Sequence, residues 1–190
     1  MKDDSRAKMV RSAASLFSTR GASATSFSEV ISESGAPRGS IYHHFPEGKK
    51  QLAEDAIQWT AERVLAYLRA STAVTPGEVL AYFIAIWRHV VVSSGASAGC
   101  AVAGVAVDTP RGDADVMRAV SATFRSWSDL LAEQLAAAGV PPQRAGTIAL
   151  ATLAAMEGAL ILCRAEGSVA PLDAVAEELM RFLPENPAAS

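Results

Sequence analysis

The chain has 190 residues, of which 50% are hydrophobic and 19% are charged. This length can bury one sizeable core, and this composition excludes an intrinsically disordered protein. The net charge of -3 is unevenly divided, because residues 1–50 carry eight lysines and arginines against five acids, while the remaining residues carry nine against fifteen. A basic first part fits a protein in which one end is attracted to phosphates, although the difference alone is a weak signal.

Neither the cysteines nor the apolar stretches indicate an exported or membrane protein. Cys100 and Cys163 have no metal-ligand or redox spacing, so we expect them in the core of a protein from a reducing cytosol. The first residues lack the apolar segment of a signal peptide. The apolar stretches 79–92 and 147–163 are interrupted by charged residues, and neither gives the ~20 uninterrupted apolar residues of a bilayer span. We therefore expect buried helices, no membrane contact and a cytoplasmic location.

An all-α fold is predicted, because apolar residues recur at helical spacing along almost the whole chain and strand signals are nearly absent. We expect about nine helices, three in an N-terminal domain of residues 1–50 and six in a C-terminal domain of residues 51–190. The predicted helices span residues 6–19, 26–35, 37–46, 49–70, 76–93, 100–107, 113–138, 141–166 and 171–183.

The second and third predicted helices meet at a tight turn, Ser34-Gly35-Ala36-Pro37. Ser26-Phe27-Ser28-Glu29 fits the capping box that begins a helix, and Pro37 suits the first turn of the next helix. Two short helices joined in this way form the helix-turn-helix layout, whose second helix enters the major groove of DNA. Small helical bundles without this function also contain short helices with polar outer faces.

The third predicted helix has an inward and an outward face. At about 100° per residue, Pro37, Ile41 and Phe45 fall on the inward side. There we expect them to pack on Phe17, Phe27 and Val30. The outward side and its edges carry Arg38, Gly39, Ser40, Tyr42 and His43.

The residue types of the outward face suit contact with DNA. Gly39 lets the backbone approach the groove floor, Arg38 can fork onto a guanine edge, and Ser40 can reach a base or a phosphate. Tyr42 and His44 are placed to donate to phosphates on either side. Ammonium groups at the start of the next helix add charge near free backbone amides, where anions already bind well.

The run from Gly35 to Phe45, G-A-P-R-G-S-I-Y-H-H-F, resembles the G-V-s-r-G-t-l-Y-x-H-F signature of TetR-family regulators. The segment Ala14 to Phe17 followed by Gly21 is similar to the opening of that family, and the resemblance extends over about residues 6–57. It implies that Arg38, Gly39, Ser40 and His43 face bases, and that Ser26, Ser28, Tyr42, His44 and a lysine hold the DNA backbone. The base-facing residues would then determine which DNA sequence is preferred, and the backbone-binding residues would fix the position of the protein along the duplex.

One departure concerns the segment from Phe45 to Lys50, which is one residue longer than the commoner F-x-s-K-e-e-L. Because of it, the sequence leaves open whether Lys49 or Lys50 binds phosphate. The longer H-H-F-P-x-G-K form looks like a branch of the family that includes multidrug-type repressors.

The resemblance also implies a homodimer, because one DNA-binding domain of this size contacts only half of a palindromic site and a second subunit is needed for the other half. In the family the last two long helices of each subunit form a four-helix interface, here residues 147–164 and 172–182. The first of them carries many small residues that allow a close approach of helices. For any single residue, packing inside one subunit is an equally good interpretation.

A small-molecule effector is expected among the helices of residues 76–166. The residues that could line its site are Phe83, Trp87, Met117, Phe124, Trp127 and Met156, with Arg88, His89 or Glu157 as polar anchors. Each aromatic residue taken alone is more often a core residue. Glu157 is the most unusual, since an acid in so apolar a helix needs a partner, a ligand or an interface. An apolar, aromatic site favours a lipophilic or planar molecule.

These features together favour a DNA-binding repressor, and two other functions are the alternatives to it. An enzyme is disfavoured because two of the three histidines lie in the DNA motif and His89 has no nucleophile at a spacing such as G-x-S-x-G. Paired metal ligands and glycine-rich phosphate loops are missing as well, so no metal or cofactor is expected. An activator or a ligand-independent regulator would share the same site, and repression is favoured only as the prevailing mode of the family.

Overall fold

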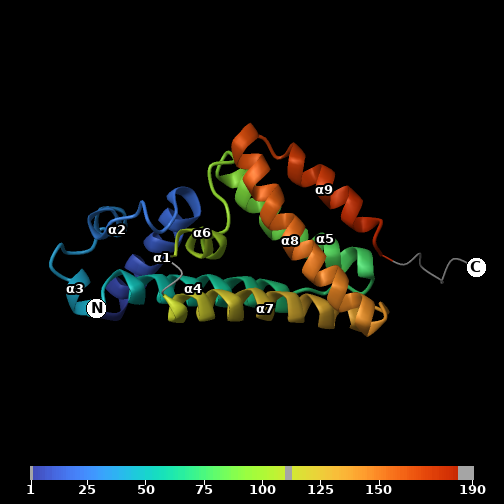
Figure 1. The fold of residues 1–190 in the computed structure, drawn as a ribbon, viewed down its shortest axis with the longest axis horizontal. Coiled ribbons are helices and arrows are strands. Elements are labelled where there is room, and N and C mark those ends of the chain that lie inside the picture. The colour runs from blue at the N-terminus through green and yellow to red at the C-terminus, as the bar shows by residue number, and fades with distance from the viewer. Residues whose placement is uncertain (1, 110–112, 184–190) are drawn as a thin grey trace, which may run out of the picture. The chain divides into compact units, whose positions relative to one another are not determined.

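The computed structural model describes residues 2–109 and 113–183, which form nine α-helices and no strand (Figure 1). The helices are α1 (Lys2–Arg20), α2 (Phe27–Ser34), α3 (Ile41–His44), α4 (Lys49–Arg69), α5 (Pro76–Ser93), α6 (Ala101–Asp108), α7 (Ala114–Ala137), α8 (Pro142–Glu166) and α9 (Ala170–Met180). The predicted all-α fold is confirmed. Of the bounds, α1 begins at Lys2 rather than Arg6, and α9 ends at Met180 rather than Leu183.

The chain divides into two compact units. One comprises Met1–Arg63 and Ala98–Thr123, and the other Val64–Ser97 and Phe124–Ser190. We call them the N-terminal and the C-terminal unit. Both α4 and α7 contribute residues to each unit. This division reflects packing, whereas the boundary expected at residue 50 separates functions and stays a prediction.

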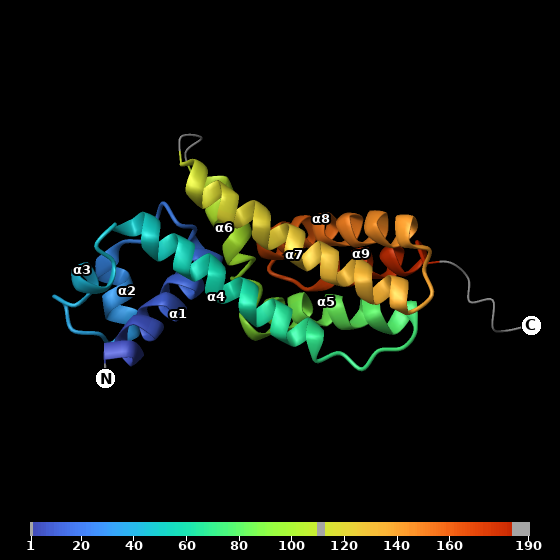
Figure 2. The same ribbon diagram turned by 90° about the horizontal axis from the view of Figure 1, so that it is seen from below.

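The N-terminal unit is built around α1, which packs against α2, α3 and α6 (Figure 2). Its core side chains include Met9 and Phe17 of α1, Val30 of α2, and Leu52 of α4, all essentially inaccessible to solvent. As predicted, α2 begins with a complete capping box at Ser26 and ends at a left-handed glycine, Gly35 (φ 65°).

The segment from Pro37 to Ser40 is not helical, which corrects the predicted third helix. The Ser40 amide donates to the Pro37 carbonyl over 2.9 Å and closes a turn, and α3 begins only at Ile41. Proline and glycine both favour turns, and glycine lowers helix propensity, so this segment gains little from helical conformation. Pro37 is exposed rather than packed on the core.

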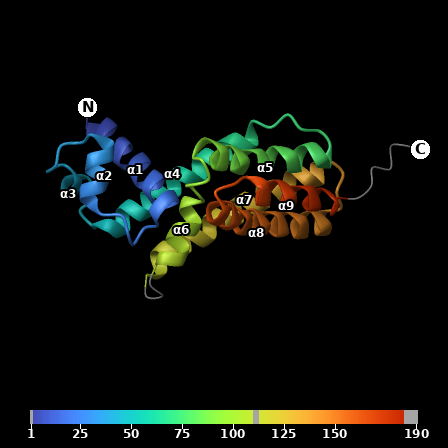
Figure 3. The same cartoon turned by 90° about the horizontal axis from the view of Figure 1, so that it is seen from above.

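In the C-terminal unit, α5, α8 and α9 pack against one another (Figure 3). A stacked pair joins the last turn of α4 to α5, because the rings of Tyr67 and Tyr82 lie 4.4 Å apart by their centroids and each hydroxyl donates to the other residue's carbonyl. Arg88 of α5 forms a bidentate ion pair with Asp173 of α9. Cys163 of α8 is buried, as is Cys100 before α6.

Within the described ranges, one helix, α8, is long and apolar enough to cross a membrane. Nearly half of its most apolar part is buried inside the protein. A single helix of this kind is weak support for a membrane protein, because core helices of soluble proteins meet the same criterion. One face of α8 nevertheless carries exposed apolar side chains, including Leu150 and Ile161.

Candidate nucleic-acid interface

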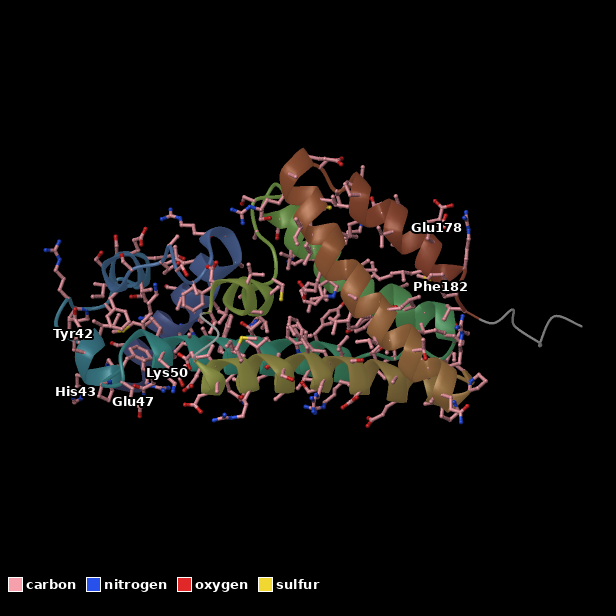
Figure 4. The ribbon with its side chains drawn as sticks, in the orientation of Figure 1. Tyr42, His43, Glu47, Lys50, Glu178 and Phe182 are labelled. Atoms are coloured by element: carbon pink, nitrogen blue, oxygen red, sulfur yellow. The ribbon has the colours of Figure 1, made fainter. Side chains whose placement is uncertain are left out.

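Two buried side chains anchor α3 to the unit beneath it. Ile41 and Phe45, one helical turn apart, are both fully buried. Between them, Tyr42 is 70% exposed, and Arg38, Gly39 and His43 are exposed as well. The prediction of an inward and an outward face is therefore right for Ile41 and Phe45 and for the exposed residues Arg38, Gly39, Tyr42 and His43, and wrong for Pro37, while Ser40 is half-buried. Phe27, which was expected under the inward face, has a ring contact with Tyr42 of the outward face. Figure 4 shows Tyr42 and His43 at the outer side of α3.

The polar side chains of α3 are partly held in place by local contacts. The Ser40 hydroxyl donates to the Pro37 carbonyl over 2.7 Å. The rings of His43 and His44 meet edge to face at 5.5 Å, and half-buried His44 also lies against Phe45. Ordering of this kind reduces the side-chain entropy that a ligand would otherwise have to remove on binding.

A second cluster of polar side chains lies at the start of α2. The Ser26 hydroxyl accepts from the Glu29 amide, the Glu29 carboxylate accepts from the Ser26 amide over 2.8 Å, and the hydroxyls of Ser26 and Ser28 are 3.0 Å apart. Both serines are exposed. Hydrogen bonds from the Ser26 backbone and side chain, together with the Arg20 guanidinium, hold the pKa of the Glu29 carboxyl below its usual value. Two ordered hydroxyls thus sit at a helix N-terminus, where anions are favoured.

The two adjacent lysines at the start of α4 have different partners. Lys50 pairs with Asp115 and, over 3.7 Å, with Asp113, and the hydrogen bond to Asp115 raises the pKa of its ammonium (Figure 4). Lys49 is exposed and donates to the Ser23 carbonyl over 3.1 Å. Within the described part of the chain Lys49 has no acidic partner, so its charge is available to an external anion.

The aromatic residues expected to line an effector site do come together in the C-terminal unit. Phe83, Trp87, Trp127 and Phe124 form a chain of edge-to-face contacts, with ring centroids 6.3, 5.7 and 5.7 Å apart. Except for half-buried Phe124, these rings are buried.

The remaining predicted effector residues differ in their surroundings. Met156 is fully buried in α8, and Glu157 beside it is half-buried. His89 is exposed on α5, and Met117 is a 36% exposed residue of the N-terminal unit. Arg88 is engaged by Asp173, so its guanidinium already has an anionic partner.

Among the described residues of the C-terminal unit, the Trp87 Nε1 and the Thr152 Oγ1 are buried without a hydrogen-bond partner. Such groups cost free energy, and each calls for an explanation such as a bound molecule or an ordered water. Sequence reasoning missed Thr152. The available signal was a hydroxyl in the middle of an otherwise apolar helix.

A cavity of about 290 Å³ lies elsewhere in the C-terminal unit. It is lined by Ser71, Ala73, Val74, Val79, Gln134, Ala137 and Ala138. None of these residues was expected at an effector site. No group of three potential metal-ligating side chains occurs in residues 2–109 and 113–183.

Comparison with known proteins identifies the family. Residues 10–56 match the family described as "Bacterial regulatory proteins, tetR family", and residues 76–178 match "Transcriptional regulator LmrA/YxaF-like, C-terminal domain". The chain belongs to the TetR family of transcriptional regulators. The match at residues 10–56 spans the helix-turn-helix, so this TetR-family chain is a DNA-binding regulator of transcription.

Whole-chain relatives of this TetR-family protein carry the same description. The HTH-type transcriptional regulator Rv0196 of Mycobacterium tuberculosis is 39% identical over 185 residues, covering 94% of this chain and 93% of that one. The HTH-type transcriptional regulator LmrA of Bacillus subtilis is 28% identical over 173 residues, covering 89% and 91%.

Solved structures share the TetR fold. A TetR transcriptional regulator from Legionella pneumophila superposes with a TM-score of 0.82 at 20% identity, covering 93% of this chain and 96% of that one. A TetR-family regulator from Agrobacterium tumefaciens has a TM-score of 0.83 at 22% identity, covering 97% and 100%. At these identities the likeness concerns the fold.

Proposed function

We propose that the protein is a repressor that binds palindromic operator DNA as a homodimer and releases it when a small lipophilic or planar molecule enters the C-terminal unit. The observation that carries the DNA-binding part is the arrangement of α3. Ile41 and Phe45 are buried, while Arg38, Tyr42 and His43 are exposed, and the ring contacts of Tyr42 with Phe27 and of His43 with His44 leave the polar atoms of both side chains at the surface. A short helix that is anchored by buried residues on one side and exposed on the other is suited to enter the major groove of DNA.

Contacts to bases come from the outer side of the turn and of α3. Arg38 reads a guanine edge, Gly39 permits close approach of the backbone, and Ser40 and His43 supply further polar contacts. The exposure of Arg38, Gly39 and His43 supports these roles, whereas Ser40 is half-buried and its hydroxyl donates to the Pro37 carbonyl.

Contacts to phosphates come from three places on the N-terminal unit. Ser26 and Ser28 act at the start of α2, and Tyr42 and His44 act from α3. Lys49 rather than Lys50 supplies the ammonium group, because Lys50 is neutralised within the chain by Asp115 and Asp113. Phosphate contacts fix the register in which the base contacts are made.

Dimerisation through α8 and α9 is supported by the exposed face of α8. Leu150 and Ile161 are 62% and 69% exposed, and exposed Ala154 and Gly158 lie between them at helical spacing. A stripe of large apolar side chains separated by small ones invites close packing of a second helix. Phe182, just beyond α9, is also exposed and extends the apolar surface expected at a two-fold interface.

The effector site is proposed at the aromatic cluster of Phe83, Trp87, Phe124 and Trp127. The unpartnered Trp87 Nε1 supports it, because a planar molecule with a hydrogen-bond acceptor would satisfy this donor. Residues 1–50 then bind DNA and residues 51–190 bind the effector and the second subunit. Such a regulator works in the cytoplasm, where its operator is accessible.

The experiment that tests this function starts with the purified chain and a library of random duplexes. Repeated selection is expected to enrich one palindrome, bound at nanomolar concentration by two subunits. Placing that palindrome between a promoter and a reporter should lower expression only when the protein is present. Failure to enrich any duplex at low salt would overturn DNA binding, whereas increased expression would favour an activator.

A further inference from the structure

We infer that Asp108, the last residue of α6, is a positioning residue for Lys49 and thereby for a DNA phosphate contact. The inference rests on the proposed function, in which Lys49 binds phosphate. It adds a residue that is distant from the helix-turn-helix in sequence and belongs to a helix outside it. Three steps connect Asp108 to Lys49, and all of them lie within the N-terminal unit.

The first step is the close packing of α6 on α1. A Cβ at Gly104 would lie 2.7 Å from the Phe17 carbonyl oxygen, closer than real Cβ atoms come to such an atom. The backbone of α6 therefore rests directly on that of α1. Just before α6, the Gly99 amide donates to the Ser18 carbonyl over 2.8 Å. These contacts leave α6 no room to slide on α1 without breaking them.

The second step is a pair of hydrogen bonds by which Asp108 fixes the turn between α1 and α2. Its carboxylate accepts from the Ser23 amide over 3.0 Å, and its backbone carbonyl accepts from the Ser23 hydroxyl over 3.3 Å. Gly21 has a φ of +83°, and a Cβ there would lie 2.2 Å from the Asp108 carboxylate. Glycine at position 21 thus provides both the left-handed conformation and the space that the carboxylate occupies.

The third step joins the same turn to Lys49. The Ser23 carbonyl accepts from the Lys49 ammonium over 3.1 Å. An ammonium group has three donors, so this bond leaves two for a phosphate. Ser23 is therefore held by Asp108 through its amide and hydroxyl, while its carbonyl holds Lys49. Removal of Asp108 frees the turn and lets the Lys49 side chain return to its many rotamers.

The two lysines at the start of α4 are therefore fixed by contacts with different helices, which has a consequence for regulation. Lys49 is tied through Ser23 to α6, whereas Lys50 is tied directly to Asp115 of α7. A displacement of α6 relative to α1 would loosen the Lys49 contact and leave the Lys50 pair in place. Asp108 is thus the point at which α6 acts on the phosphate contact.

A double-mutant cycle tests this inference on the full-length protein with the selected operator. K49A is expected to weaken binding about tenfold, in the range of a charge-assisted hydrogen bond, and to lower the slope of log affinity against log salt by about one per subunit. D108A should weaken binding several-fold and lower the slope similarly. The double variant should bind no more than about twofold more weakly than K49A, because the two residues act as one unit.

The sign of the D108A effect separates this inference from simple electrostatics. Removing an acid makes the protein more positive, which by itself strengthens binding to DNA. The matched control is D129A, which removes an exposed acid of α7 and should bind as tightly as the wild type or slightly more tightly. D108N keeps an oxygen that can accept from the Ser23 amide and should restore most of the affinity.

Folding is checked by the thermal unfolding of each variant. Should D108A not fold, D108E replaces it, because the longer side chain keeps the charge but moves the carboxylate away from its present position against the Ser23 amide; it is also expected to weaken binding. If the wild type selects no duplex, the proposed function fails. If the wild type binds and D108A or D108E binds equally well, or if the D108A and K49A effects add, only the role of Asp108 is overturned.

Discussion

Phe27 and Tyr42 meet edge to face, with ring centroids 5.7 Å apart and ring planes at 77°. Phe27 begins α2 and Tyr42 lies in α3, so the contact joins the two helices of the helix-turn-helix on their outer side. An aromatic pair of this kind restrains a side chain that is otherwise 70% exposed. The Tyr42 hydroxyl is thereby held in a defined position.

Tyr42→Phe should weaken binding to all duplexes alike. The variant keeps the ring contact with Phe27 and loses only the hydroxyl, so its cost is about 1 kcal/mol, that of one hydrogen bond. Gel-shift titrations with the selected operator and with scrambled duplexes would measure the effect, and thermal unfolding should be unchanged. A loss confined to one base position would contradict the assignment of Tyr42 to the DNA backbone.

Arg38→Ala should relax one operator position and cost about 1–3 kcal/mol of affinity. The reason is that Arg38 is exposed at the turn before α3 and can form two hydrogen bonds with a guanine. Repeating the duplex selection with the variant would show a loss of preference at that position. Arg38→Lys serves as the control for charge, since it keeps the cation without the planar fork and should also lose the preference.

The capping box of α2 should make stability depend on pH. The folded-state pKa of Glu29 is lowered, chiefly by the Ser26 backbone hydrogen bond, so its contribution is present above the unfolded pKa of a glutamate, about 4.3, and is lost as pH falls through the lower folded value. Urea unfolding of the wild type and of Glu29→Gln should differ near neutral pH and converge in acid. A constant difference across this range would contradict the linkage.

A charge on the exposed face of α8 should prevent dimerisation. Ile161→Asp places a carboxylate where the second subunit is expected, and burying an unpaired charge costs several kcal/mol. Light scattering should give a monomer with unchanged helical content. Val92→Asp is the matched control, because Val92 is a 56% exposed apolar residue of α5 in the same unit. A dimeric Ile161→Asp variant would place the interface elsewhere.

Thr152→Val should stabilise the protein in the absence of effector. The Thr152 hydroxyl is buried without a partner, and valine has nearly the same shape without the polar atom. The gain is about 1 kcal/mol, which raises the melting temperature by roughly 2–4 °C in a protein of this size. A lower melting temperature would show that the hydroxyl has a partner in solution, such as an ordered water.

Much of the fold could be predicted because its signals are local. The capping box at Ser26, the left-handed glycine at position 35 and the proline at position 76 mark helix ends through contacts within a few residues. The exposure of Tyr42 in α3 followed from helical periodicity, whereas Arg38 is exposed in the turn before that helix.

The rest depends on contacts that are distant in sequence. Lys50 and Asp115 are 65 residues apart, and Ser23 and Asp108 are 85 apart, so no spacing rule reveals either pair. The predicted third helix began at Pro37 because proline suits the first turn of a helix, but Pro-Arg-Gly-Ser forms a turn here and α3 begins at Ile41. The position of that turn had to come from the structure.

The burial of Ile41 and Phe45 beneath α3 has an evolutionary consequence. In the proposed DNA-binding mode Arg38 and His43 face the bases, and because both are exposed, we expect their substitution to change the operator with little loss of stability. New binding sites can therefore arise by single steps, each in a viable protein. Proteins that share this fold at about 20% identity can therefore differ in the side chains that this surface presents.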